Sequence, residues 1–384
     1  MALRKCVDLA PGNRFAGGVT ADRFAQSRTP WIKLWADWSV CEPRPGVFDF
    51  AALDADLTQA RGRGLKAILA CWRFPLWANG FDGRWNTPRT SQFEATKYDR
   101  MTHAQYDAGN FSSFKAAEYR PPGDLSPRSP WGRWIETLIV RYRGWVDFLE
   151  ICNEPGLQHW PQHRPSTSGD PWAADPGGEV AHVATASMFQ TARTVRNRYG
   201  STPILLGPAS DDGLTTSTPR LRTGVDRFTD LLLGELALRR FKPGSKFAWS
   251  HHNYTDMERD LSGAANRAAM VRRRLVGRWA GYPAGTSADP QLMLTEGGVR
   301  WQKIASSSGV SLEPANYAFF EARQRDLIAS TYARLTGGTA DGAGIGMLTN
   351  YQMSTDPGFD TGLCYADGRP RAAYGWWRDS FPPA

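Results

Sequence analysis

The sequence predicts an α/β protein that folds as a single (β/α)8 barrel, or TIM barrel. Three observations indicate this class. The chain contains eight short apolar segments bounded by turn residues, amphipathic stretches of helical spacing lie between them, and the connections are short on one side and long on the other. Strands that alternate with helices are typical of parallel βαβ units, and eight of them favour a closed barrel over an open sheet.

The elements follow in chain order. The expected strands are residues 4–9, 31–35, 66–72, 146–152, 203–206, 246–252, 291–295 and 344–349. The clearest expected helices are residues 53–63, 131–142, 180–199, 225–240, 264–279 and 317–335. No internal repeat or low-complexity tract interrupts this alternation.

The lengths of the connections indicate where the functional end of the barrel lies. Helix-to-strand connections such as 62–65 and 199–202 are short, whereas several strand-to-helix loops are long, namely 74–130, 156–179, 297–316 and 351–372. In a barrel all strand-to-helix loops gather at the C-terminal face, where active sites lie. We therefore expect one catalytic domain of residues 1–384, with a long loop insertion at about 79–130.

Composition excludes several other classes of protein. Charged residues make up 22% of the 384 residues and apolar residues 41%, as in soluble globular proteins. No uncharged apolar run of 18 residues is present, so we expect no membrane span. The start of the chain lacks the apolar core of a signal peptide. This predicts a cytoplasmic protein, or a secreted one from which a signal has been removed.

The net charge of +8 comes from 46 Lys and Arg against 38 Asp and Glu. The arginines are spread along the chain among acidic neighbours, which is typical of solvated helix faces and predicts no nucleic-acid partner. None of the five cysteines forms a CxxC pair, so we expect neither a zinc site nor a disulfide framework. The adjacent His251 and His252 face opposite sides of a strand and are not expected to share a metal ion.

Two glutamates stand at the ends of apolar segments, 142 positions apart. Glu154 closes the segment VDFLEICNEP at the fourth strand, and Glu296 closes QLMLTEGG at the seventh. Pro155 is expected to hold Glu154 in an extended backbone conformation at the rim. The Gly297-Gly298 pair permits a tight turn and close approach of a ligand. Hydrolysis of a glycosidic bond needs two carboxyl groups that face each other in this way.

Further motifs carry a resemblance to a known group of enzymes. They are WIKLWADWSVCEPRPGVFDF, LACWRFPLWANG, PPGDLSPRSPWGRWIETLIVRYRGWVDFLEICNEP, SHHNY, LTEGG and DTGLCYADGRPRAAY. With them the chain resembles clan A of the glycoside hydrolases, retaining barrel enzymes with catalytic glutamates at strands four and seven. The group around family 39 is the most similar, with families 5 and 42 nearby, and the resemblance covers most of the chain.

The resemblance implies a role for five residues. Glu154 would be the general acid/base and Glu296 the nucleophile of a double displacement. Asn153 would hydrogen-bond the sugar hydroxyl beside the anomeric carbon, Tyr254 would touch the nucleophile, and His252 would line the same pocket. No metal or organic cofactor is implied.

The chain departs from the family pattern at three places. Cys152 replaces the Trp that usually precedes Asn-Glu-Pro, and Gly297 replaces an aromatic residue after the nucleophile. Asn350 and Tyr351 stand where the family often has Trp at the end of strand eight. These departures leave the chemistry recognisable and the sugar undetermined, with Tyr351 as a candidate substrate-binding residue.

Aromatic and basic residues at strand exits are the remaining candidates for substrate binding. Sugars stack their C–H faces on indole rings, and the chain has sixteen tryptophans. We select Trp35, Trp72 and Trp301, the last because it follows the expected nucleophile by five positions. Arg73, just after strand three, is a candidate for binding a hydroxyl or a carboxylate.

The sequence therefore predicts a retaining glycoside hydrolase whose partner is an oligo- or polysaccharide. We expect exo action on a plant or bacterial glycan of xyloside, arabinofuranoside or glucoside type. An endo-acting glycanase and a catalytically inactive carbohydrate-binding barrel stay open as alternatives. The loop at 79–130 could wall off a short pocket, fold aside, or reach a neighbouring subunit, so a homo-oligomer also stays open.

Overall fold

The strands form the predicted closed barrel. The computed structural model describes residues 3–11, 13–15, 19–75, 77–78, 121–156, 181–199, 204–207, 224–241, 247–278, 292–355 and 359–382. All eight strands pair in parallel in chain order, and β1 closes the ring against β8. The strands are β1 Arg4–Asp8, β2 Trp31–Asp37, β3 Lys66–Trp72, β4 Phe148–Glu150, β5 Ile204–Gly207, β6 Phe247–His252, β7 Leu292–Glu296 and β8 Ile345–Tyr351.

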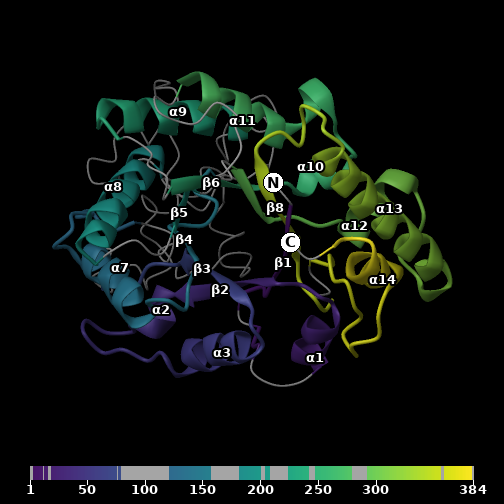
Figure 1. Cartoon of the computed structure of the whole chain (residues 1–384), viewed down its shortest axis with the longest axis horizontal. Helices are drawn as coiled ribbons and strands as arrows, with labels where there is room; N and C mark the ends of the chain where they lie inside the picture. The colour runs from purple at the N-terminus through teal and green to yellow at the C-terminus, as the bar shows by residue number, and fades with distance from the viewer. Residues whose placement is uncertain are drawn as a thin grey trace, which may run out of the picture.

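Helices surround the strands (Figure 1). The expected helices are present as α3 Ala51–Gly62, α7 Pro130–Arg141, α8 Ala181–Tyr199, α9 Val225–Leu238, α11 Arg267–Arg278 and α13 Tyr317–Thr336. Further helical elements are α1 Val19–Gln26, α2 Trp38–Cys41, α10 Tyr254–Glu258, η3 Gly263–Ala265, α12 Trp301–Ser308, η4 Pro314–Asn316 and α14 Ala372–Asp379. The expected insertion at 79–130 lies outside the described residues as far as residue 120.

Local sequence explains where these helices begin. Ser129 precedes α7, and its hydroxyl accepts a hydrogen bond from the backbone N–H of Gly132 at 3.2 Å. Pro130 occupies the first helical position, where its missing N–H costs nothing. Asp37 caps α2 in the same way, by accepting from the N–H groups of Ser39 and Val40. Both caps come directly from residue types that favour helix starts.

The lowest layer of side chains inside the barrel, here called the floor, is apolar. It determines which side chains of the next layer point inward. It consists of Cys6, Trp31, Ile68, Phe148, Ala248, Met293 and Met347, all buried. Side chains two positions further along a strand face the same way. Asp8, Lys33 and Glu150 therefore point into the barrel one layer above Cys6, Trp31 and Phe148. The alternation that buries the floor thus places three charged groups inside the barrel.

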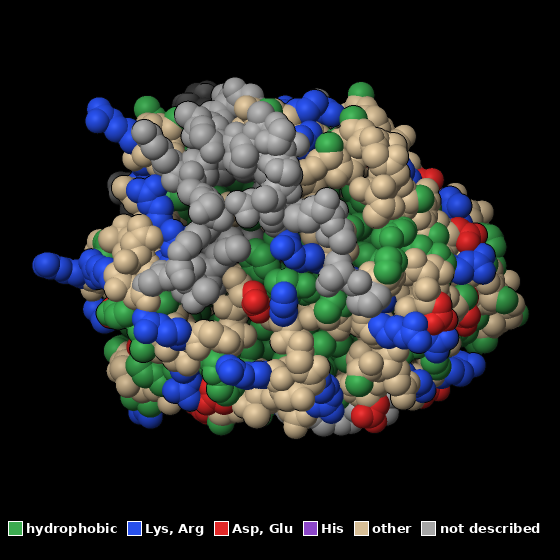
Figure 2. Space-filling view, viewed as in Figure 1, with side chains coloured by type: hydrophobic (Ala, Val, Ile, Leu, Met, Phe, Trp, Pro, Cys, Tyr) green, Lys and Arg blue, Asp and Glu red, His purple; other side chains and the backbone are tan. Residues whose placement is uncertain are grey.

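The main core lies between the strands and the helix layer. Trp38 and Trp134 stack there with ring centroids 5.6 Å apart, both fully buried. All five cysteines are buried and unpaired. Among the described helices, none combines the length and the apolar character needed to cross a bilayer. Lys and Arg side chains are dispersed over the described residues of the face shown in Figure 2.

Candidate active site

The structure brings Glu154 and Glu296 into one pocket at the C-terminal end of the strands. The pocket has a volume of about 190 Å³. It is lined by Pro11, Trp35, Trp72, Asn153, Glu154, Tyr254, Glu296, Arg300, Tyr351 and Phe359. Seven of these are residues that the sequence singled out. The convergence of the two carboxylates, on which the sequence argument depended, is therefore observed.

Glu154 reaches the pocket through a left-handed turn rather than through an extended backbone. Its φ is 45°, so the expectation that Pro155 keeps it extended is wrong. The turn directs the side chain back toward the barrel, where Oε1 lies 2.8 Å from Nδ1 of His252. Arg73 and Gln352, which follow β3 and β8, also have positive φ angles of 53° and 75°. Such conformations in non-glycine residues are unfavourable and cluster at functional sites.

Glu296 is the last residue of β7 and is held from two sides. Its Oε1 lies 2.7 Å from Nζ of Lys33, and its Oε2 accepts a hydrogen bond from the Tyr254 hydroxyl at 3.1 Å. Tyr254 begins α10 directly after β6, so the end of that strand fixes its position. The contact that the resemblance implied between Tyr254 and Glu296 is thus present.

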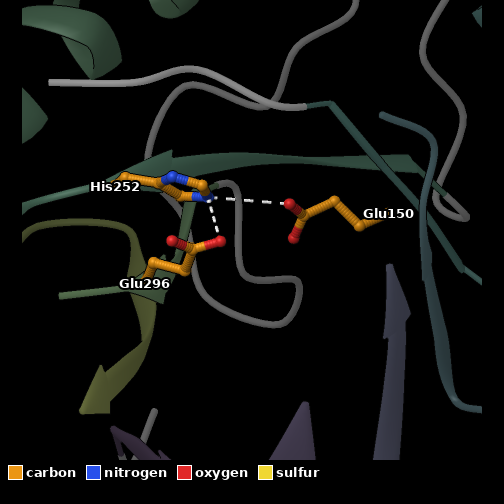
Figure 3. Close-up of side chains that lie close together, drawn as sticks. All are labelled: Glu150, His252 and Glu296. Atoms are coloured by element: carbon orange, nitrogen blue, oxygen red, sulfur yellow. Dashed lines mark ion pairs between the residues drawn. The ribbon is translucent and has the colours of Figure 1, made fainter. Parts of the chain in front are cut away.

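The ring of His252 lies close to the carboxyl groups of Glu296 and Glu150 (Figure 3) and also to that of Glu154. Its Nδ1 contacts Glu154, and its Nε2 lies 3.3 Å from Oε1 of Glu296 and 3.6 Å from Oε1 of Glu150. The adjacent His251 belongs to the opposite side of β6 and is fully buried, and burial holds its pKa well below the ordinary value. One imidazole ring therefore joins both predicted catalytic glutamates.

Sequence reasoning missed three buried charged residues beneath this pocket. Lys33 lies at the centre, with Nζ 2.7 Å from Glu296, 3.3 Å from Glu150 and 3.5 Å from Asp8. Asp8 also accepts a hydrogen bond from the Trp35 indole at 2.8 Å. The available signal was a charged residue with apolar residues two positions away on both sides, in each of three strand segments.

Burial and ion pairing act in opposite directions on the pKa values of Glu150, His252 and Lys33. Burial disfavours the charge on Glu150, but Lys33 and His252 outweigh burial and lower its pKa to about 2. Burial also disfavours imidazolium, yet Glu296, Glu150 and Glu154 raise the pKa of His252 to about 10. Burial disfavours the charge of Lys33 as well, but Glu150, Glu296 and Asp8 outweigh burial and raise its pKa.

Asp8 behaves differently from its neighbours. Its burial raises its pKa well above the ordinary value, although Lys33 opposes the shift. At neutral pH the interior therefore holds two cations, Lys33 and His252, while burial disfavours the charged form of Asp8.

The spacing of Glu150, His252 and Glu296 would also suit metal ligands. However, the Lys33 ammonium lies within 2.7 Å and 3.3 Å of the same carboxylate oxygens that would bind the ion. At neutral pH, below its pKa of about 10, His252 carries a second ring proton and cannot offer a lone pair from Nε2. This donor set therefore does not fit a divalent cation, and Lys33 already supplies the positive charge.

Two of the three selected tryptophans lie at the pocket. Trp35 and Trp72 line it and meet edge to face, with ring centroids 5.7 Å apart. Tyr351 also lines it and contacts the ring of Tyr254. Phe359, which the sequence did not single out, completes this aromatic wall. The pocket is thus bounded by flat apolar faces with carboxylates between them.

Trp301 does not reach the pocket, so its selection as a subsite residue is wrong. It begins α12, is only 2% exposed, and stacks on Phe320 of α13 at 5.4 Å. The Arg371 guanidinium covers its ring at 3.8 Å. The helix turns the indole toward α13, and the preceding Arg300 faces the pocket in its place.

Arg73 lies beside the pocket rather than on its wall. Its guanidinium covers the ring of Trp72 at 4.0 Å and forms an ion pair with Asp37 at 3.4 Å. It is not among the lining residues. Arg300, which does line the pocket, donates to Glu258 at 2.8 Å and covers Phe359 at 4.7 Å.

Gly297 and Gly298 follow Glu296, and both lie close to neighbouring side chains. A Cβ on Gly297 would lie 2.9 Å from Sδ of Met257 and closer still to the Asn253 side chain. A Cβ on Gly298, whose φ is 149°, would lie 2.9 Å from Cβ of Thr361. The missing side chains allow close packing of the loop beneath Glu296, and the close approach of a ligand stays a prediction.

Comparisons with known proteins agree with this barrel. A family 39 glycoside hydrolase from Bacteroides cellulosilyticus WH2 matches 99% of this chain at 12% identity and a TM-score of 0.54, and this chain spans 63% of its length. Xylanase B from Clostridium stercorarium F9 matches 98% of this chain and 97% of its own length at 12% identity, with a TM-score of 0.55.

Xylanase 10C from Cellvibrio japonicus, solved with xylopentaose, matches 98% of this chain and 66% of its own length at 12% identity, with a TM-score of 0.59. No family model matches the chain, and no curated protein matches it by sequence. At such low identities the likeness shows the fold. The barrel fold is shared with these glycoside hydrolases.

Proposed function

We propose that this protein is a retaining glycoside hydrolase in which Glu154 is the acid/base and Glu296 the nucleophile. The observation that carries the proposal is the meeting of both carboxylates on one imidazole at the C-terminal end of the barrel, Glu154 at Nδ1 and Glu296 at Nε2 of His252. Two carboxyl groups on opposite sides of a bound sugar are what the double displacement requires. The fold shared with known glycoside hydrolases supports the same function.

In the proposed reaction each of these groups has a part. Glu296 bonds to the anomeric carbon, the bond to the leaving oxygen breaks, and that oxygen takes the proton from Glu154. Lys33 and Tyr254 hold Glu296 from opposite oxygens, which orients it for attack. In the second step a water oxygen bonds to the anomeric carbon, the bond from that carbon to Glu296 breaks, and Glu154 takes the proton that the water loses. Asn153, on the pocket wall, is placed to bind a hydroxyl of the same sugar.

The substrate that we propose is a plant or bacterial glycan, cleaved from its end. A pocket of about 190 Å³ with aromatic walls has room for roughly one sugar ring. Trp35 and Trp72 form one wall and Tyr351 another, as stacking surfaces for the flat faces of a sugar. Xyloside, arabinofuranoside and glucoside linkages are the first to test, since several proteins of similar fold are xylanases.

Endo action is the second candidate. It is favoured by a further pocket of about 180 Å³ next to the first, which shares Trp35 and Trp72 with it. A glycan that extends across these two rings would place additional sugars in the second pocket. A catalytically inactive carbohydrate-binding barrel is less well supported, because both carboxylates and their charged partners are in place.

A panel of aryl glycosides and of plant and bacterial polysaccharides tests the proposal. Products would be identified by mass and linkage, and the configuration at the anomeric carbon would be followed by NMR from the first turnover. Retention of configuration supports the double displacement, and an inverted first product overturns it. Release of single sugars from chain ends distinguishes exo action from the mixed oligosaccharides of endo action.

A further inference from the structure

Glu150 is a fully buried carboxylate to which the proposed chemistry assigns no role. It is the last residue of β4, four positions before Glu154, and it is not part of the pocket wall. Its Oε1 nevertheless lies 3.3 Å from Nζ of Lys33 and 3.6 Å from Nε2 of His252. Placing an ionised group here has a considerable desolvation cost, so its presence calls for a physical explanation.

Glu150 and Glu296 share the same two cations. Glu296 Oε1 lies 2.7 Å from Lys33 Nζ and 3.3 Å from His252 Nε2, and Glu150 Oε1 approaches the same two nitrogens. Figure 3 shows the two carboxylates on either side of the imidazole edge. The four groups therefore alternate in sign, and each cation lies between two anions.

The proposed reaction removes one of these anions. When Glu296 forms an ester with the sugar it becomes neutral, so Lys33 loses the carboxylate nearest to it. Asp8 lies farther from Lys33, at 3.5 Å, and its burial raises its pKa well above the ordinary value, which disfavours its charged form. Glu150, at 3.3 Å and with a pKa below its ordinary value, is then the stronger counter-charge of Lys33.

We infer that Glu150 is a permanent counter-anion, a positioning residue that keeps Lys33 and His252 charged and in place while Glu296 carries the sugar. This inference rests on the proposed function for its role in the reaction, but the sharing of two cations by two carboxylates is a property of the protein alone. An unpaired buried charge is strongly destabilising. Glu150 therefore stabilises the covalent intermediate without touching the substrate.

The sharing can be tested without any substrate. Glu296→Gln imitates the neutral ester, and it is compared with Glu150→Gln and with the double variant in the full-length protein. The charge of His252 is followed by NMR of labelled imidazole between pH 5 and pH 10, with His252→Gln to assign its signal among the six histidines. Melting temperatures are recorded for the wild-type protein, the two single variants and the double variant. Glu150→Asp, which keeps the charge, is the matched control.

We expect each single variant to keep His252 protonated at pH 7, because Glu154 and one of the two shared carboxylates still contact the ring. In the double variant Glu154 still contacts Nδ1, so we expect the pKa of His252 to fall below its value in either single variant, and the melting temperature to fall by more than the sum of the single losses. A double variant in which His252 titrates as in Glu296→Gln alone overturns the inference, as do additive melting losses.

If Glu150→Gln does not fold, Lys33→Met/Glu150→Gln removes one charge of each sign. Recovery of the fold then supports the pairing, and continued failure contradicts it.

A kinetic measurement examines the consequence for the reaction. With the aryl glycoside found by the panel, wild-type protein that accumulates the glycosyl-enzyme gives a burst of phenol, and we expect Glu150→Gln to reduce that burst at least tenfold. An unchanged burst overturns the role in the intermediate. If no glycoside is cleaved at all, the proposed function fails, while the NMR comparison still decides whether Glu150 is the second anion.

Discussion

Nζ of Lys33 lies 2.7 Å from Oε1 of Glu296, and both side chains are buried inside the barrel. Lys33 comes from β2 and Glu296 from β7, strands that are not neighbours in the ring. The contact therefore spans the interior and depends on closure of the whole barrel. It ties the orientation of the proposed nucleophile to the integrity of the fold.

Removing either proposed catalytic carboxylate should abolish most of the activity. Glu154→Ala and Glu296→Ala are each expected to lower kcat/KM on a poorly activated glycoside by roughly 10³-fold or more. Azide should restore turnover of Glu154→Ala on an activated aryl glycoside, because it needs no base to attack the intermediate. Glu313→Gln, at an exposed position, is the matched control. Wild-type rates in Glu154→Ala would show that another group is the acid.

Loss of the central ammonium should destabilise the protein. Lys33→Met leaves Glu150 and Glu296 buried without their nearest cation, and we expect a cost of about 3–5 kcal/mol in the free energy of unfolding. Urea titration followed by circular dichroism measures this cost. Lys303→Met, on an exposed face of α12, should change stability little. Equal stabilities for the two variants would contradict an ion-paired Lys33.

The raised pKa of His252 predicts a particular pH dependence. Its folded pKa of about 10 lies above the ordinary 6.5, so its contribution to stability is complete below pH 6.5 and is lost as pH rises through 10. We expect wild-type protein to lose stability, on the order of a few kcal/mol, between pH 7 and pH 10. His252→Gln should lack this component and have a flatter profile. Parallel profiles would mean that His252 is not protonated in the folded protein.

Trp72 and Trp301 should respond oppositely to truncation. Trp72→Ala opens the pocket wall, so we expect a rise in KM for the substrate found by the panel with little loss of stability. Trp301→Ala removes a buried indole between α12 and α13 and should cost about 3–5 kcal/mol in unfolding free energy. Kinetics and thermal melting of both variants separate the two roles. A stable Trp301→Ala with raised KM would restore Trp301 as a substrate-binding residue.

Gly297 should tolerate no side chain. In Gly297→Ala the added Cβ meets Met257 at 2.9 Å and crowds Asn253, so the loop below Glu296 must shift. We expect lower stability and a loss of kcat larger than any rise in KM, because the shift misplaces Glu296. Gly62→Ala, whose new Cβ has no neighbour within 4 Å, is the matched control. Unchanged kcat in Gly297→Ala would show that the loop adjusts without moving Glu296.

The barrel and the two proposed catalytic residues were predictable from the sequence. Apolar segments of strand length, separated by amphipathic helices, indicate parallel strands, and all eight were located within a few residues of their observed ends. Glu154 and Glu296 were found because a strand end in a barrel determines which face of the molecule a residue occupies. Their positions are set by local sequence and by the topology that the sequence pattern implies.

The charged interior was decided only by tertiary structure. Asp8, Lys33 and Glu150 lie on three different strands, so no local segment contains two of them. Their proximity arises only when the ring closes and the apolar floor fixes which side chains point inward. The left-handed turn at Glu154 and the burial of Trp301 have the same origin, since contacts with His252 and with α13 outweigh local preference. Sequence pattern determines which elements form, whereas the pairing of charges depends on distances across the barrel that no local segment encodes.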